Sequence, residues 1–202
     1  MMNSALILPP VKDLFGYGEI WRVWTYQFLH ANIEHLVTNV LLQFLAGATL
    51  EIVHGPLRTG VLYTTGVIIG GCFHIIVSPQ VALVGASGGG YTLLGVSLAN
   101  VAMNYKEMNM YGKFIRILVL SLFMAAEIAV GVARMSDLND QNVSWACHLG
   151  GALVGVTFGI VILKNFVLEK KEIYAQLVFL ILFTLLLIAT STTLLVKYAI
   201  YL

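Results

Sequence analysis

Six apolar segments separated by short polar loops limit what this chain can fold into more than any other feature. A helix needs roughly 20 mostly apolar residues to cross the hydrocarbon core of a bilayer, which is about 30 Å thick. The segments comprise residues 36–53, 57–77, 87–103, 114–133, 145–163 and 177–196. Because unpaired backbone polar groups are too costly in lipid, we expect each segment to cross the membrane as a helix. The predicted fold class is therefore all-α, a polytopic transmembrane helical bundle with about six spans.

The composition agrees with an integral membrane protein and argues against other classes. Of the 202 residues, 59% are hydrophobic and 10% are charged, whereas a soluble domain carries about 25% charged residues. The formal net charge of +1 argues against a nucleic-acid partner. The two cysteines, Cys72 and Cys147, form neither a C-x-x-C pair nor a zinc-ligand spacing. We therefore expect no metal and no cofactor.

Lysines and arginines are distributed unevenly between the two sides of the predicted bundle. One side carries Arg58, Lys106, Lys113, Arg116, Lys164, Lys170 and Lys171, and the other carries Lys12, Arg22, Arg134 and Lys197. Because cytoplasmic loops carry the excess of positive charge, we expect the first side to be cytoplasmic. Both ends of the chain are then predicted to lie outside the cell or in a lumen.

The third segment begins with a G-x-S-x-G motif that places Ser87 between Gly85 and Gly89. Glycine tolerates positive φ and close backbone approach, which suits a sharp turn that lifts a nucleophilic serine onto a helix start. The motif alone is weak, because small residues in membrane helices more often mark close packing. This segment rises only about 25 Å, less than the hydrocarbon thickness. We therefore expect it at the centre of the bundle, with its serine end below the membrane surface.

The fifth segment carries one histidine close to its start. His148 shares a helix face with three glycines at offsets of 3, 7 and 11, namely Gly151, Gly155 and Gly159. The repeated G-x-x-x-G lets another helix pack with its backbone close, and the glycine-rich third segment is the natural partner. That packing would put His148 level with Ser87. Tyr91, one turn after Ser87, would then stack on the imidazole.

A serine hydroxyl becomes a good nucleophile when a base takes its proton, and neutral histidine is the usual base. The alternative for His148 is a buried histidine bonded to a backbone carbonyl. No acidic residue is placed to complete a triad, because Asp137 and Asp140 lie in the loop just before His148. We therefore predict a Ser–His dyad. Glu127, a carboxylate within the fourth segment, is expected to make a structural hydrogen bond.

The first segment carries a polar face made of Asn32, His35, Asn39 and Gln43, spaced three or four residues apart. One interpretation is hydrogen bonding between helices, which polar residues in membrane helices often provide. The other is that His35 and Asn39 donate to the oxyanion of a tetrahedral intermediate, beside the N–H of Ser87.

In combination, these motifs resemble the rhomboid family of intramembrane serine proteases. The resemblance rests on Trp21-Arg22, on His35 with Asn39, on the run 85–88, and on the run 147–151 continuing to Gly155. Their order and spacing fit the family over roughly residues 19–166, about three quarters of the chain. The run 50–58 and a span after the histidine helix resemble the animal secretase-type members.

The resemblance implies roles for individual residues. Ser87 would be the nucleophile and His148 the general base, with His35, Asn39 and the Ser87 N–H as the oxyanion hole. The supporting residues would be Tyr91, Gly85, Gly88, Gly151, Gly155, Trp21 and Arg22, the last two in a surface structure beside the active-site cavity. Substrates in the family are single-pass membrane proteins cut in or near an easily unwound transmembrane segment. The resemblance further implies a multi-pass protein of the secretory pathway, in the Golgi or plasma membrane.

The expected organisation has three parts. Residues 1–35 form a luminal or interfacial segment with the Trp-Arg structure, 36–166 the protease core, and 167–202 a cytoplasmic linker and an extra helix. The family core has a membrane helix before the Trp-Arg structure, where this sequence has only Ala5–Leu8 ahead of two prolines. We therefore expect five core spans plus one. Two alternatives are a catalytically inactive, truncated rhomboid-like protein that binds transmembrane helices, and, ranked last because no internal repeat is visible, a channel or transporter.

Overall fold

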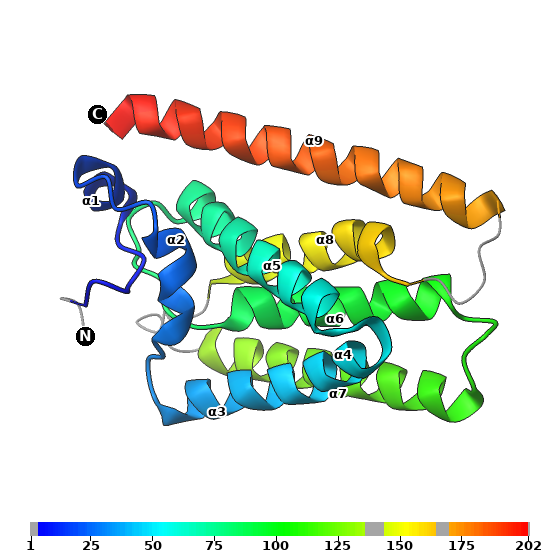
Figure 1. Cartoon of the computed structure of the whole chain (residues 1–202). Coiled ribbons are helices and arrows are strands. Elements are labelled where there is room, and N and C mark those ends of the chain that lie inside the picture. The colour runs from blue at the N-terminus through cyan, green and yellow to red at the C-terminus, as the bar shows by residue number, and fades with distance from the viewer. Residues whose placement is uncertain (1–3, 136–143, 165–169, 202) are drawn as a thin grey trace.

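The helices of the chain are arranged around one central, nearly buried helix, as the computed structural model in Figure 1 shows. The structure describes residues 4–135, 144–164 and 170–201, with the side chains of all of these except residues 124, 127, 128 and 130–135. Short helices come first: α1 (Val11–Gly16), α2 (Arg22–Thr25) and a 3-10 turn, η1 (Tyr26–Phe28). The longer elements are α3 (Ile33–Leu42), the π-turn η2 (Gln43–Gly47), α4 (Ala48–His54), α5 (Pro56–Val77), α6 (Ser87–Met103), α7 (Met110–Met135), α8 (Trp145–Ile162) and α9 (Lys170–Tyr201).

Each predicted apolar segment lies in a helix of the structure. Among the described residues, four helical stretches are long and apolar enough to cross a membrane: Ile33–His54, Pro56–Val77, Trp145–Ile162 and Lys170–Tyr201. The other two predicted segments correspond to α7 and to α6, which has 17 residues. Within the described ranges the chain forms no β-strand, and a single β-bridge pairs Leu8 with Leu83. The prediction of an all-α, polytopic helical bundle is confirmed.

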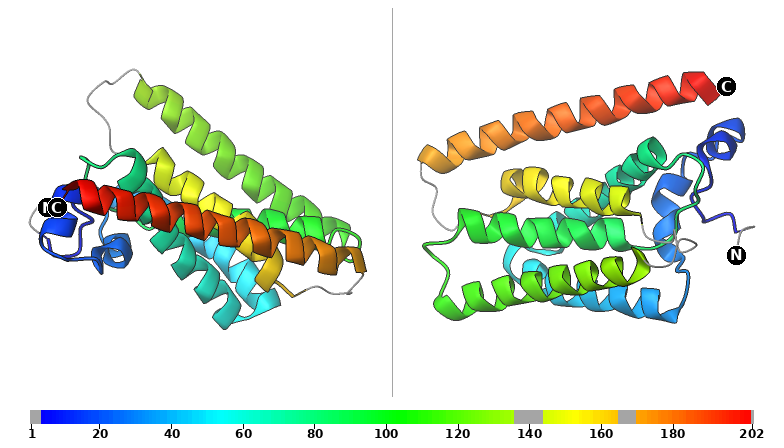
Figure 2. Two further views of the ribbon diagram at one scale, coloured as in Figure 1. Left: turned by 90° about the horizontal axis from the view of Figure 1, so that it is seen from above. Right: turned by 180° about the vertical axis from the view of Figure 1, so that it is seen from behind.

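The central position belongs to α6, as its short length and glycine content predict. In Figures 1 and 2, α6 runs between α8 and α7, and its most extensive packing is on α8 and α5. Of its 17 residues, 13 are buried. A helix with polar and small side chains is most stable at membrane depth when other helices cover it, because lipid offers no hydrogen bonds.

Glycines bring the backbones of α6 and α8 into direct contact. A Cβ atom at Gly151 would collide with the carbonyl oxygen of Gly88, and one at Gly155 would collide with the carbonyl oxygen of Thr92. The contact is reciprocal, since a Cβ at Gly95 would lie 2.7 Å from the carbonyl oxygen of Ala152. This close contact brings the first turn of α8 level with the first turn of α6.

The last helix, α9, lies along the outside of the bundle against α8 and α5 (Figure 1). Only 11% of its most apolar window is buried, so most of its surface is available to lipid. Its C-terminal end meets α1, where the rings of Tyr198 and Phe15 pack edge to face at 5.2 Å. Both ends of the described chain therefore lie at the end of the bundle where α6 and α8 begin (Figure 2).

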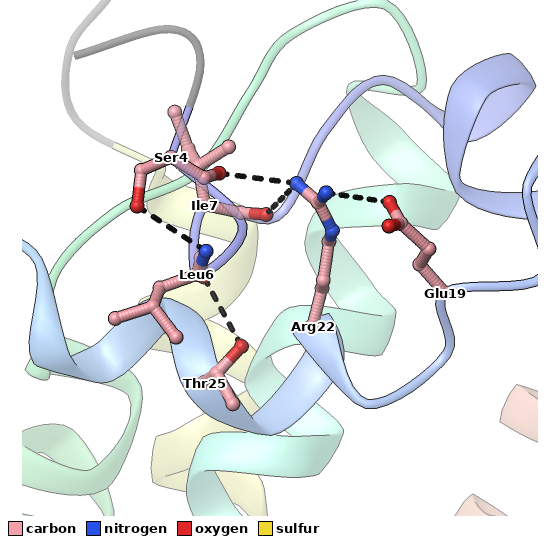
Figure 3. Close-up of polar contacts among 6 residues, drawn as sticks. All are labelled: Ser4, Leu6, Ile7, Glu19, Arg22 and Thr25. Carbon is pink, nitrogen blue, oxygen red and sulfur yellow. Dashed lines mark hydrogen bonds and ion pairs between the residues drawn. The ribbon is translucent and has the colours of Figure 1, made fainter.

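The predicted interfacial segment before the first span folds into short helices linked by turns. Figure 3 shows Arg22 donating from Nη1 to the carbonyl oxygens of Ser4 and Ile7, both at 3.2 Å, and pairing with Glu19. Thr25 adds a bond to the carbonyl oxygen of Leu6. These bonds fold the first residues of the chain back onto α2.

The first span contains a π-turn that hydropathy did not predict. The turn covers Gln43–Gly47, and the hydroxyl of Thr49 donates to the carbonyl oxygens of Leu45 and Ala46 after it. A π-turn holds an additional residue and so changes which face the following helix presents. Gln43, the first residue of this turn and a member of the predicted polar face, lines a groove between the η2–α4 stretch and α5.

Candidate active site

The structure brings the side chains of Ser87 and His148 into hydrogen-bond contact. Ser87 is the first residue of α6 and His148 the fourth of α8. Ser87 Oγ lies 2.9 Å from His148 Nε2, and the imidazole is buried, with 7% of the residue exposed. When the hydroxyl donates to Nε2, the imidazole can accept the serine proton, and Nδ1 then carries the ring hydrogen. The pair therefore has the geometry of a nucleophile and its general base.

Two aromatic rings hold the imidazole of His148. The ring of Tyr91 stacks on it with centroids 4.1 Å apart and planes within 12°. The ring of Trp145 meets it edge to face at 6.0 Å. Tyr91 lies one turn after Ser87 on α6, so one helix presents both the hydroxyl and the ring that supports its partner. The stacking on Tyr91 holds the imidazole in the orientation in which Nε2 faces the hydroxyl of Ser87.

The other imidazole nitrogen has no protein partner among the described residues. Nδ1 of His148 is buried and neither donates a hydrogen bond to a described residue nor accepts one from it. Asp137, Asp140 and the side chain of Glu127 lie outside the described part of the chain. The described residues thus form a Ser–His pair. They also contain no cluster of three His, Cys, Asp or Glu side chains that could hold a metal ion.

Gly85 forms the turn that leads into Ser87. Its φ of +114° lies in a region that other residues rarely adopt. Its N–H donates to the carbonyl oxygen of Tyr26 at 3.2 Å. A Cβ atom at this position would lie 2.5 Å from Cε1 and 2.8 Å from Nε2 of His35. Glycine is therefore required both for the backbone conformation and for the approach of His35 to the serine turn.

The predicted polar face lies on α3 and at its two ends, and its side chains differ in what they contact. Asn32 begins the helix, and its Oδ1 accepts the N–H of His35 at 2.8 Å. Asn39 is buried and donates one amide hydrogen to the carbonyl oxygen of His35 at 2.8 Å. Gln43 lies at the groove described above. Of the predicted polar face, His35 is thus the member that the structure places directly against the serine turn.

Tyr26 is a residue of the site that the sequence did not indicate. It is fully buried, donates to the carbonyl oxygen of Val67 at 2.8 Å, and lies 3.5 Å from Cys147 Sγ. Its hydroxyl fills the space under the helix start, because a Cβ at Gly88 would lie 2.9 Å from it. Burial, and then the neighbouring Cys147, raise the pKa of the Tyr26 phenol well above 10.0, so it remains a hydrogen-bond donor at neutral pH. A tyrosine in the predicted interfacial segment belongs to no motif that would have singled it out.

Thr92 is a second residue that the sequence did not single out. Its hydroxyl lies 2.8 Å from the carbonyl oxygen of Gly88 and 2.9 Å from that of Gly151. A Cβ at Gly66 would collide with the same side chain. Thr92 therefore connects α6 to α8 at the point where α5 crosses both, one turn below the serine. The available signal was a lone threonine among glycines in a membrane helix, where hydroxyls commonly bond to backbone carbonyls.

Comparison with known proteins agrees with the resemblance that the sequence motifs indicate. Residues 17–165 match the family described as the Rhomboid domain. The human Rhomboid-related protein 3 is 36% identical over 170 residues, which cover 82% of this chain and 41% of that protein. Rhomboid-related protein 1 of Caenorhabditis elegans is 39% identical over 156 residues, covering 77% of this chain and 43% of the relative.

A third relative is named as an inactive protein. Inactive rhomboid-related protein 2 of Caenorhabditis elegans is 30% identical over 158 residues, covering 78% of this chain and 44% of that protein. The chain therefore spans about two fifths of the length of these three relatives. The matched range 17–165 contains every predicted site residue, from Trp21 to Gly155.

Proposed function

The chain belongs to the rhomboid family, and on that premise we propose that it is an intramembrane serine protease. It hydrolyses a peptide bond in or near the transmembrane segment of single-pass membrane proteins. The observation that carries this proposal is the 2.9 Å contact between Ser87 Oγ and His148 Nε2, made at the starts of two helices whose backbones touch. Packing at this density keeps a reactive pair at a defined distance.

The proposed reaction uses each member of the pair twice. Ser87 Oγ attacks the carbonyl carbon of the scissile bond while its proton passes to His148 Nε2. When the tetrahedral intermediate collapses, His148 gives this proton to the leaving amine and the acyl-enzyme ester remains. A water molecule then loses a proton to His148 and attacks the ester, which releases the acid product and returns the proton to Ser87.

Three groups near the turn are proposed to stabilise the negative oxygen of the intermediate. The N–H of Ser87 belongs to the first turn of α6, where backbone N–H groups have no partner within the helix. His35 lies against the turn at Gly85, and the amide of Asn39 has a second hydrogen beyond the one bonded to its own helix. Losing one such donor typically costs about 10²–10³ in rate.

The protein is an integral membrane protein, and we propose that it works in the secretory pathway, at the Golgi or plasma membrane. The supporting observation is the uneven charge of its loops, which predicts that the Ser87 end of the bundle faces away from the cytoplasm. Trp21 is 55% exposed at that end, as an aromatic at the membrane interface would be. The partners are thus the bilayer and substrate helices that enter it.

A second candidate function is binding of transmembrane helices without cleavage. The observation in its favour is that one relative, 30% identical over 78% of this chain, is named inactive. The two functions differ in a property that can be measured directly. A protease needs an assembled, nucleophilic Ser87, whereas a helix-binding protein does not.

The test is labelling of the purified full chain in detergent with a fluorophosphonate, a reagent that forms a covalent bond with activated serines. We expect the wild type to be labelled and Ser87→Ala and His148→Ala to be unlabelled. Ser97→Ala is the matched control, since Ser97 is also a buried serine of α6, and it should label like the wild type. A folded wild type that resists labelling would contradict the protease and leave helix binding as the function.

A further inference from the structure

A second buried histidine, His74, lies near the end of α5 and uses both of its ring nitrogens. Nε2 lies 2.8 Å from the carbonyl oxygen of Val81, and Nδ1 lies 2.7 Å from Ser144 Oγ. His74 is 3% exposed. None of the motifs that define the dyad includes this residue. Its two partners belong to different parts of the chain, Val81 to the segment before Ser87 and Ser144 to the start of α8.

The partners determine where the hydrogens lie. A carbonyl oxygen can only accept, so Nε2 of His74 carries the ring hydrogen and donates to Val81. Nδ1 of the neutral ring then accepts the hydroxyl hydrogen of Ser144. The same Ser144 oxygen accepts the N–H of Cys147 at 3.1 Å and so caps α8. Three consecutive hydrogen bonds thus connect Val81 to the first turn of α8.

One end of this connection leads to the nucleophile. Val81 belongs to the segment between α5 and α6, which is bonded at alternate residues on its way to Ser87. Val81 is held by His74, Leu83 exchanges two backbone hydrogen bonds with Leu8 at 3.1 and 2.8 Å, and Gly85 donates to Tyr26. His74 is therefore one of several attachments along the segment that leads to the serine.

The other end leads to the base. Ser144 is one helical turn before His148, whose N–H donates to the Ser144 carbonyl oxygen at 3.1 Å. The first turn of a helix lacks the full set of internal hydrogen bonds and frays most easily. The glycine contacts between α6 and α8 hold the two helices together from Gly88 and Gly151 onward. The connection through His74 adds an attachment on the other side of the dyad, one turn before His148.

We propose that His74 and Ser144 are positioning residues for the Ser87–His148 dyad. The imidazole of His74 joins the segment that carries the nucleophile to the cap of the helix that carries the base, and this connection sets the distance between Ser87 Oγ and His148 Nε2. The inference rests on the proposed protease function. A misplacement of about 1 Å can cost about 100-fold in rate, so the connection affects reactivity more than binding.

The first experiment measures fluorophosphonate labelling of the purified full chain over time. His74→Phe removes both hydrogen bonds and keeps a ring of similar volume. We expect its maximal labelling rate to fall about 10- to 100-fold while the reagent concentration for half-maximal rate stays unchanged. His74→Gln should recover part of the rate, because its carboxamide can donate at one atom and accept at the other.

Variants of Ser144 distinguish the connection through His74 from simple capping of α8. Glycine is nearly as good as serine at the start of a helix but has no hydroxyl. If Ser144 only caps α8, Ser144→Gly labels like the wild type, and this result would overturn the inference. If the connection positions the dyad, Ser144→Gly is labelled as slowly as His74→Phe, and Ser144→Thr regains the wild-type labelling rate. The double variant, His74→Phe with Ser144→Gly, is then labelled no more slowly than either single variant.

The matched control is His54→Phe. His54 is also a buried histidine, 2% exposed, and its Nδ1 accepts the N–H of Lys164 at 3.2 Å, at the end of α8 remote from Ser87. Thermal unfolding is measured for every variant. If His54→Phe slows labelling as much as His74→Phe at equal loss of unfolding temperature, the role of His74 is only structural and the inference fails. If the wild type is not labelled, the proposed function fails and this inference with it, whereas a labelled wild type with unaffected His74 variants overturns the inference alone.

Discussion

Three buried histidines of this chain differ in what their ring nitrogens contact, and the difference separates their roles. Both nitrogens of His74 are bonded, to Val81 and to Ser144, so its ring is fixed in one tautomer. His54 accepts a backbone N–H. His148 meets the hydroxyl of Ser87 and is otherwise held by the stacked ring of Tyr91 and the edge contact with Trp145, which leave its Nε2 lone pair directed at a proton it can take. At the scale of single residues, these contacts decide which of the three rings can take the proton of Ser87.

Gly85 provides a test at this scale. We expect Gly85→Ala to abolish fluorophosphonate labelling, because the new Cβ would both strain a φ of +114° and displace the ring of His35. The backbone strain alone should cost about 1–3 kcal/mol in the free energy of unfolding.

Gly55 gives the matched control for this prediction. Its φ is also positive, +89°, but a Cβ there would meet no atom within 4 Å. Gly55→Ala should therefore lose stability by a similar amount and keep its labelling rate. Equal labelling rates in the two variants would show that His35 does not depend on the space at Gly85.

At the scale of elements, the contact between α6 and α8 determines where Ser87 and His148 lie relative to each other. Glycines of both helices face the backbone of the other helix, and the Thr92 hydroxyl lies within hydrogen-bond distance of the carbonyl oxygens of Gly88 and Gly151. The two backbones therefore lie against each other. Tyr26 closes the space below Gly88 from the side of η1. Dispersion contacts over such a surface are individually weak, but together they fix the position of one helix relative to the other. A dyad whose members lie on different helices requires this.

We expect Gly151→Ala to lower the labelling rate at least 10-fold, because its Cβ would collide with the carbonyl oxygen of Gly88 and push the helices apart. Overpacking of this kind costs about 1–3 kcal/mol of stability. Gly159→Ala is the control on the same helix face, since its Cβ would lie 3.4 Å from its nearest neighbours, an ordinary contact. If both variants behave alike, close packing near Ser87 is not what positions the dyad.

At the scale of the whole molecule, the bundle has two unlike ends. The dyad, α1 and the C-terminal end of α9 share one end, where Phe15 packs on Tyr198 and Gln80 donates to the hydroxyl of Tyr201 (Figure 2). The loop between α6 and α7 and the end of α8 lie at the other end, with Lys106 and Lys164. This arrangement agrees with the charge distribution that predicts the orientation in the membrane.

Glycosylation mapping tests that orientation. Acceptor sites added before Met1 and after Leu202 should both be modified in microsomes, and an acceptor placed in the loop 104–109 should not. Modification of that loop with neither end modified would show the reverse orientation. Modification of one end only would contradict the shared location of the two ends that α1 and α9 indicate.

The helices and the order of the site motifs could be predicted from the sequence because they depend on local properties. Hydropathy over about 20 residues marks a span. The row of glycines from Gly151 to Gly159 repeats with the helix period, and it indicated the partner of α8 correctly. The family followed from the order of short motifs along the chain and is confirmed by the match over residues 17–165.

Other features could only be decided by tertiary structure, because they are contacts between side chains far apart in sequence. The hydroxyl of Tyr26 meets Val67 and Cys147, and His74 meets Ser144, across separations of 41, 121 and 70 residues. No periodicity encodes such pairs, since each depends on how three helices cross. The sequence by itself therefore determined a membrane bundle with a serine and a histidine on two glycine-rich helices. Only the packing of these helices decided that the two side chains lie 2.9 Å apart, and which buried residues hold them there.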